Sequence, residues 1–254
     1  MSDRSGQPPS LGVRDTAPHP ELLSALGRLV RGLSLLFWGL PIALVVCTMT
    51  AHGEWFRQYG VGPALLATTL LCYGLSLLGH FQKQERPWIA ALDRARIFAF
   101  VNLGLSPFLY WWSRVPSHPF LAAIVQALVF TGILFLICLN PLLARLSAML
   151  PDETLRAETR LFSGINRIVL TFILVLVSAY SLALRIDPGL PDKFLGWVLG
   201  FFPVTRYSGL LIALFEQSRS TLLIFLVLLP LAMTMALIWK IKEVILASVF
   251  GPDH

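Results

Sequence analysis

Hydrophobic residues occur along this chain in long uncharged blocks, and short polar segments between the blocks carry most of the charge. A helix of about 20 apolar residues is long enough to cross the roughly 30 Å of hydrocarbon in a bilayer. The blocks therefore predict an all-α, polytopic integral membrane protein with six transmembrane helices. These helices are expected at about residues 32–51, 61–80, 97–113, 120–140, 168–185 and 220–240.

One further apolar stretch, residues 194–217, admits two interpretations. It is long enough to cross a membrane, but Arg206 lies at its middle and Pro203 precedes that arginine. An arginine at the centre of a span costs about 2.5–3.5 kcal/mol, and two half-helices that enter and leave by one face avoid this cost. We therefore expect a re-entrant or interfacial half-helix pair before the last span, with a seventh span as the alternative. Arg206, Glu216 and Arg219 then form a possible polar site on the outer side, unless Glu216 and Arg219 simply pair with each other.

Both ends of the chain are polar and are expected to lie outside the membrane. Residues 1–19 are rich in Pro, Gly and Ser and cannot bury enough apolar area to order themselves, which predicts a disordered tail. Residues 251–254 form a second, short tail. The chain between them, residues 20–250, is expected to be a single helical membrane domain.

Composition identifies lipid as the solvent of this chain. Hydrophobic residues make up 56% of the sequence and charged residues only 13%, and one soluble core cannot hide that much apolar surface. The net charge of +6 would suggest nucleic acid in a soluble protein, but in a membrane protein it reports basic loops on the cytoplasmic side. We therefore expect a multi-pass protein of the plasma (inner) membrane, with both termini cytoplasmic and with no nucleic-acid partner.

The predicted spans are poor in groups that carry chemistry. None has an acidic or basic residue near its middle, whereas ion- and proton-coupled transporters commonly use such residues as relays. The three cysteines lie in separate apolar blocks and the five histidines are scattered singly, so no metal and no cofactor are predicted. No catalytic residue is indicated. Asn102, Asn140 and Asn166 lie in or near spans, where such side chains more often hydrogen-bond neighbouring helices than bind substrates.

Two polar segments on the cytoplasmic side contain the candidate binding residues. Arg156, Arg160 and Arg167 follow helical spacing and form one charged stripe before the fifth span. Arg94 and Arg96 precede the third span. These arginines suit contacts with anionic lipid headgroups or with a partner protein. The alternative is a solvated helix and a basic loop whose charges only set the topology.

The pattern leaves several functions open. A scaffold or accessory subunit of a membrane assembly requires only packed helices and a partner-facing surface, and it is the expected function, whereas an enzyme is not favoured. The layout is also similar to that of ABC-2-type exporter permeases, because Leu22, Leu26 and Leu29 predict an amphipathic helix before the first span and half-helices precede the last one. This resemblance implies a transport component for a lipid or other amphiphilic substrate, a homodimer and a cytoplasmic ATPase partner. A lipid-modifying enzyme is the third possibility.

Overall fold

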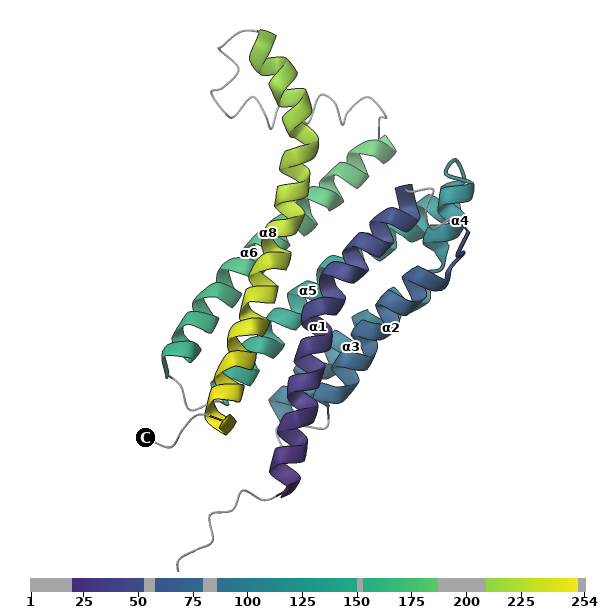
Figure 1. The fold of residues 1–254 in the computed structure, drawn as a ribbon. Coiled ribbons are helices and arrows are strands. Elements are labelled where there is room, and N and C mark those ends of the chain that lie inside the picture. The colour runs from purple at the N-terminus through teal and green to yellow at the C-terminus, as the bar shows by residue number, and fades with distance from the viewer. Residues whose placement is uncertain (1–19, 53–57, 80–85, 150–152, 187–208, 251–254) are drawn as a thin grey trace, which may run out of the picture.

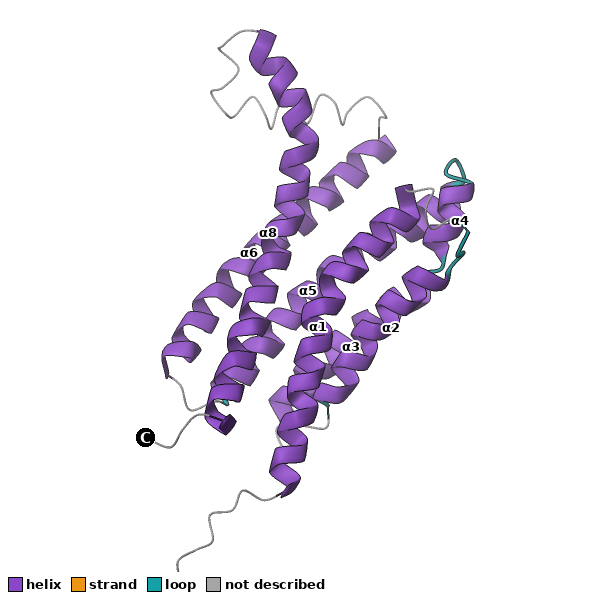
Figure 2. Ribbon diagram, in the orientation of Figure 1, coloured by secondary structure: helices purple, strands orange, loops and turns teal. Residues whose placement is uncertain are grey.

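The computed structural model describes residues 20–52, 58–79, 86–149, 153–186 and 209–250. These residues are helical apart from short connections, and no strand occurs among them (Figure 2). The all-α class is therefore confirmed. The two predicted tails lie outside the described residues, and so does the first part of the re-entrant candidate, including Arg206.

Consecutive long helices run in alternate directions along one bundle (Figure 1). In chain order they are α1 (Pro20–His52), α2 (Gly62–Leu78), α3 (Arg86–Leu105) with the short α4 (Phe108–Arg114), α5 (Pro119–Ala148), α6 (Glu153–Ile186) and α8 (Gly209–Phe250). The first residues of α1, α3 and α6 therefore lie at the same end of the bundle as the last residues of α2, α5 and α8 (Figure 1).

Helix α1 packs along α2 through a regular stripe of leucines. Leu29, Leu33, Leu36 and Leu40 recur every three or four residues and are almost fully buried. Leu26 continues the stripe toward the N-terminus and packs against the same core. Because this stripe is unbroken, the amphipathic segment predicted before the first span and the span itself form one helix.

The third predicted span, 97–113, is divided in the structure. Helix α3 ends at Leu105 and α4 begins at Phe108, with Pro107 between them. Proline has no backbone N–H to donate to the preceding turn, which explains the interruption. Helix α3 also begins well before the predicted span, so its first part carries the charged residues for which a basic loop was one of the alternatives.

Helices α6 and α8 extend far beyond their predicted spans. Helix α6 begins at Glu153 and includes the whole arginine stripe. Helix α8 has 42 residues and includes positions 209–215, which were expected to form the returning half of the re-entrant pair. At 1.5 Å per residue it is about 63 Å long, roughly twice the hydrocarbon thickness. The described part of the re-entrant candidate and the last predicted span thus share one helix.

Within the described residues, three helical segments are long and apolar enough to cross a membrane by themselves, namely Ser24–Ala51 in α1, Pro119–Ala148 in α5 and Arg156–Ala183 in α6. The distribution of side chains agrees with a membrane location. Leu66 and Phe172 are 73% and 61% exposed, whereas Asn140 and Asn166 are fully buried. Apolar groups outside and amides inside are the reverse of what water selects, and they suit a lipid environment.

Candidate functional site

Basic side chains gather at one end of the bundle, which we call the basic end. They come from every long helix except α2: Arg28, Arg31, Arg86, Arg94, Arg96, Arg145, Arg156, Arg160, Arg167, Lys240 and Lys242. At the opposite end of the bundle, the basic residues whose side chains the structure describes are Arg114 and Arg185. This asymmetry follows from the alternating helix directions (Figure 1) and has the form that positive-inside loops take.

A groove opens between α3 and α5 at the basic end. Its volume is about 220 Å³. It is lined by Pro87, Ala90, Ala91, Arg94, Cys138, Pro141 and Arg145, and we refer to it as the α3–α5 groove. Ala90 and Ala91 line the α3 side with short side chains. The apolar residues form the walls and the two arginines supply the charge.

Both arginines of the groove lack an acidic partner within the described residues. The Nε of Arg94 donates a hydrogen bond to the carbonyl oxygen of Ala90, at 3.2 Å in the same helix. Asp93, the nearest acid in sequence, forms an ion pair with Arg96 instead, at 3.6 Å. Both Arg94 and Arg145 are exposed. The groove therefore presents two positive charges that no described carboxylate neutralises.

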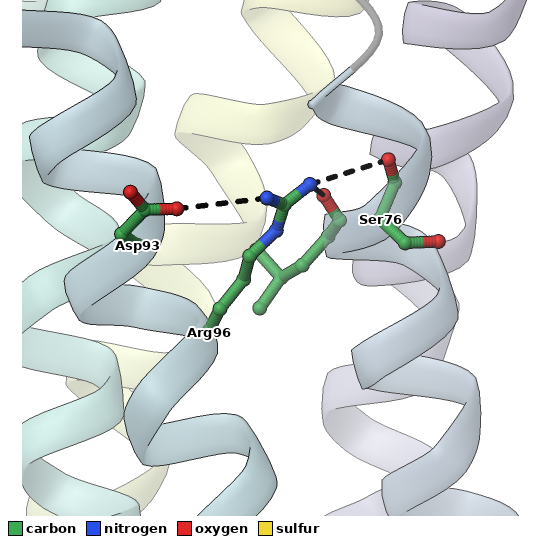
Figure 3. A network of polar contacts seen from close by, with 4 residues as sticks. Ser76, Asp93 and Arg96 are labelled. Carbon is green, nitrogen blue, oxygen red and sulfur yellow. Dashed lines mark hydrogen bonds and ion pairs between the residues drawn. The ribbon is translucent and has the colours of Figure 1, made fainter.

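Arg96 points toward the end of α2 (Figure 3). Its Nη2 donates to the carbonyl oxygens of Leu75 and Ser76, each at 3.4 Å. The last carbonyls of a helix lack partners within that helix and carry its partial negative charge, so a guanidinium is favourable there. Gly79 makes this approach possible, since a Cβ at that position would clash with the Arg96 guanidinium. The structure thus gives Arg96 a capping role and separates it from Arg94.

Among the predicted site residues whose side chains the structure describes, only Arg94 lines the groove. Arg156, Arg160 and Arg167 are carried by α6, where Arg160 and Arg167 are exposed and Arg156 is partly buried. Glu216 and Arg219 lie on α8. Arg206 lies outside the described residues. Of the five arginines that the sequence places on the predicted cytoplasmic side, Arg94 alone lines the groove.

A polar cluster is buried where α5, α6 and α8 meet, and we call it the Asn166 cluster. It consists of Asn140, Asn166, Thr234 and the carbonyl group of Pro230. The Nδ2 of Asn166 lies 3.0 Å from Asn140 Oδ1, 2.8 Å from Thr234 Oγ1 and 3.2 Å from the Pro230 carbonyl oxygen. The three side chains are completely buried. The cluster therefore links three helices through one amide.

The interhelical role expected of the asparagines is confirmed. Thr131 of α5 donates to Asn102 of α3 at 2.6 Å, and Asn166 bonds Asn140 as described above. Sequence reasoning did not identify Thr234 or Arg145. Thr234 follows Pro230 by four residues and its hydroxyl donates to the Pro230 carbonyl, a local signal that the sequence contains. Arg145 is the first charged residue after the long uncharged block of α5. This position at the end of a predicted span is the sequence signal that could have identified it.

Within the described residues no three His, Cys, Asp or Glu side chains gather as a metal site would require. No protein-family model matches the chain, and neither the curated proteins nor the solved structures contain a significant match. The fold by itself therefore defines the class: the part of the chain that the structure describes is all-helical and contains three helices long and apolar enough to cross a membrane.

Proposed function

We propose that this chain is a multi-pass membrane protein in which the six helical passes all cross the bilayer, and that it acts as a scaffold or accessory subunit of a membrane assembly. The alternating helix directions support the six crossings. They bring the basic residues of five long helices to one end, as a cytoplasmic face requires.

An exposed apolar surface on α6 carries the proposal. Leu161, Phe162 and Ile165 are 64%, 48% and 45% exposed. They precede the uncharged part of α6 and lie at the level of Arg160 and Arg167 in the sequence. We take the uncharged block after Arg167 as the crossing part of α6, so these three residues lie at the level of headgroups and water, where lipid tails do not cover a helix. Large exposed apolar side chains beside arginines are typical of a protein–protein contact.

The opposite face of α6 holds the helix in place. Thr159, Ser163 and Asn166 are buried along that face, and Leu170 and Ile173 continue it. Helix α6 packs against α5 and α8. A helix anchored on one face by the Asn166 cluster, with apolar side chains on the other face, presents a rigid edge to a second protein. This is what a scaffold needs.

Photo-cross-linking in native membranes tests this function. A photo-reactive phenylalanine analogue placed at Phe162 or Ile165 should give one discrete protein adduct. The same analogue at Phe120, which is 62% exposed on α5 at the opposite end, serves as the matched control and should not give that adduct. Adducts with lipid alone at Phe162 and Ile165 would contradict a scaffold that binds through α6.

The same experiment separates this function from transport. Recovery of a stoichiometric cytoplasmic ATPase with the chain would support the permease-like layout instead. Helix α8 is continuous from Gly209 to Phe250, whereas this layout expects the half-helix pair to be separate from the last span. We therefore place the transport component second.

A further inference from the structure

We propose that the α3–α5 groove binds the phosphate headgroup of an anionic phospholipid, with Arg94 and Arg145 as the two cationic contacts. This inference does not depend on the scaffold function, because the groove and the exposed face of α6 are formed by different residues.

The first argument is charge. Guanidinium groups bind phosphate oxygens through charge-assisted hydrogen bonds, which are about twice as strong as neutral ones. Arg94 donates one hydrogen bond, from Nε to the carbonyl oxygen of Ala90 in its own helix at 3.2 Å. This bond leaves most of the N–H donors of the guanidinium for another partner. Arg96 holds the neighbouring acid, Asp93, so this carboxylate does not occupy Arg94. An external anion is the partner that two such arginines favour.

The second argument is depth. In α3 the uncharged block begins after Arg96, and in α5 it ends just before Arg145. The groove, which contains Arg94 and Arg145, therefore spans the boundary between the apolar and charged parts of both helices. Lipid phosphates lie at this boundary, and basic pockets between transmembrane helices on the cytoplasmic side bind lipid headgroups. A soluble anion has no comparable reason to meet the protein at this depth.

The third argument is the shape and lining of the groove. Its volume of about 220 Å³ is below the roughly 300–1,000 Å³ of pockets that enclose a drug-sized ligand. A phosphate with its glycerol needs less room than a whole lipid. Ala90, Cys138 and Pro141 provide an apolar wall for the start of the acyl chains, which would continue along the exposed apolar surface of the bundle.

Lipid retention by the full-length protein tests the proposal. The chain is purified in mild detergent, titrated with phosphatidylglycerol or phosphatidylcholine, and bound lipid is counted by native mass spectrometry. Phosphatidylglycerol should be retained and phosphatidylcholine should not. The double variant Arg94→Gln/Arg145→Gln should weaken phosphatidylglycerol binding at least about tenfold, because two charge-assisted contacts are lost.

Two further variants distinguish the groove from general surface charge. Ala90→Leu keeps both arginines but fills the groove, and since Ala90 is exposed the fold should tolerate the change. It should also weaken binding severalfold. Arg31→Gln removes an exposed arginine from α1 at the same end and is the matched control, expected to bind lipid as the parent chain does. Equal losses in Arg31→Gln and the double variant would overturn the proposal.

Competition identifies the source of the phosphate. Millimolar inorganic phosphate or glycerol phosphate should leave bound phosphatidylglycerol in place. Full displacement by either soluble anion would overturn the lipid assignment in favour of a free phosphate ligand. Unchanged lipid binding in both the double variant and Ala90→Leu would show that the groove is not the site. A third outcome would also overturn the proposal. If phosphatidylglycerol binding required a co-purifying acidic protein and was lost when that protein was removed, the arginines would be assigned to that partner instead.

Discussion

The contact between α1 and α2 and the contact among α5, α6 and α8 join helices in different ways. Between α1 and α2 the backbones come close at Gly32 and Gly74, where a Cβ on Gly32 would lie 2.9 Å from the Gly74 carbonyl oxygen. Leucines fill the rest of that contact. At the second contact, Asn166 bridges to Asn140 and Thr234. The first contact depends on shape and the second on hydrogen bonds.

The difference shows how helices associate where lipid removes the usual hydrophobic driving force. Lipid tails are as apolar as leucine, so helices gain little by hiding leucine from them. Close packing through small residues and interhelical hydrogen bonds are the two remaining sources of specific association. This bundle uses one in its first half and the other in its second half, so the two contacts should respond to different substitutions.

Breaking the shape-based contact should have the largest effect. Gly32→Ala places a Cβ 2.5 Å from Leu78 Cδ1 and 2.9 Å from the Gly74 carbonyl oxygen, so the two helices must move apart. We expect a loss of about 1–3 kcal/mol in the free energy of unfolding, measured by denaturation in mild detergent. Gly27→Ala, on the same helix with nothing within 4 Å, is the control. It should stabilise by about 0.5–1 kcal/mol, and destabilisation of equal size in both variants would contradict the close approach.

Breaking the hydrogen-bonded contact should have the next largest effect. Asn166→Ala removes the amide that joins three helices, and we expect a loss of about 1–2 kcal/mol, since membrane hydrogen bonds measured singly average about 0.6 kcal/mol. Thr171→Ala on the same helix is the control, because the exposed Thr171 hydroxyl bonds only its own helix. A double-mutant cycle with Thr234→Val should give coupling of about 0.6 kcal/mol. Zero coupling would contradict the bridge.

The sequence predicted the helices better than their ends. Uncharged blocks located each long helix, because lipid forces backbone polar groups to bond within a segment. Hydrophobicity does not, however, decide where a helix stops once it leaves the membrane. Helix α6 therefore begins at Glu153, so the helical arginine stripe and the span predicted from 168 are one helix, and α8 runs through 209–217, since no described residue in those stretches breaks the helix.

The candidate site was only partly predictable for a similar reason. Arg94 and Arg96 are two positions apart, and side chains two positions apart in a helix point to different sides. Sequence alone treated them as a pair, but Arg96 caps α2 and Arg94 lines the groove. Arg145 comes from a segment 51 positions further along the chain, and which helix packs on α3 is a tertiary fact. The groove could not be assembled from spacing.

The contact between α2 and α3 combines both sources of specificity and should respond less than either. Gly79→Ala would displace the Arg96 guanidinium from the end of α2, and we expect a loss of about 0.5–1 kcal/mol, the range of a charge near a helix terminus. Arg96→Gln should give a similar loss. The double variant should lose no more than one of them, because both substitutions remove the same contact. Gly62→Ala, on α2 with open space around it, provides the control. Additive losses would show that Gly79 acts on something other than Arg96.

The smallest effect is expected from the ion pair between Lys240 of α8 and Glu158 of α6. It joins the same two helices as the Asn166 cluster, but its side chains are 49% and 48% exposed. Water and salt screen such a pair, so a double-mutant cycle with Lys240→Gln and Glu158→Gln should give about 0.2–0.5 kcal/mol, decreasing as salt is added. The exchanged pair Lys240→Glu/Glu158→Lys should recover most of it. Coupling larger than that between Asn166 and Thr234 would mean that surface charge, and not the buried amide, holds α6 against α8.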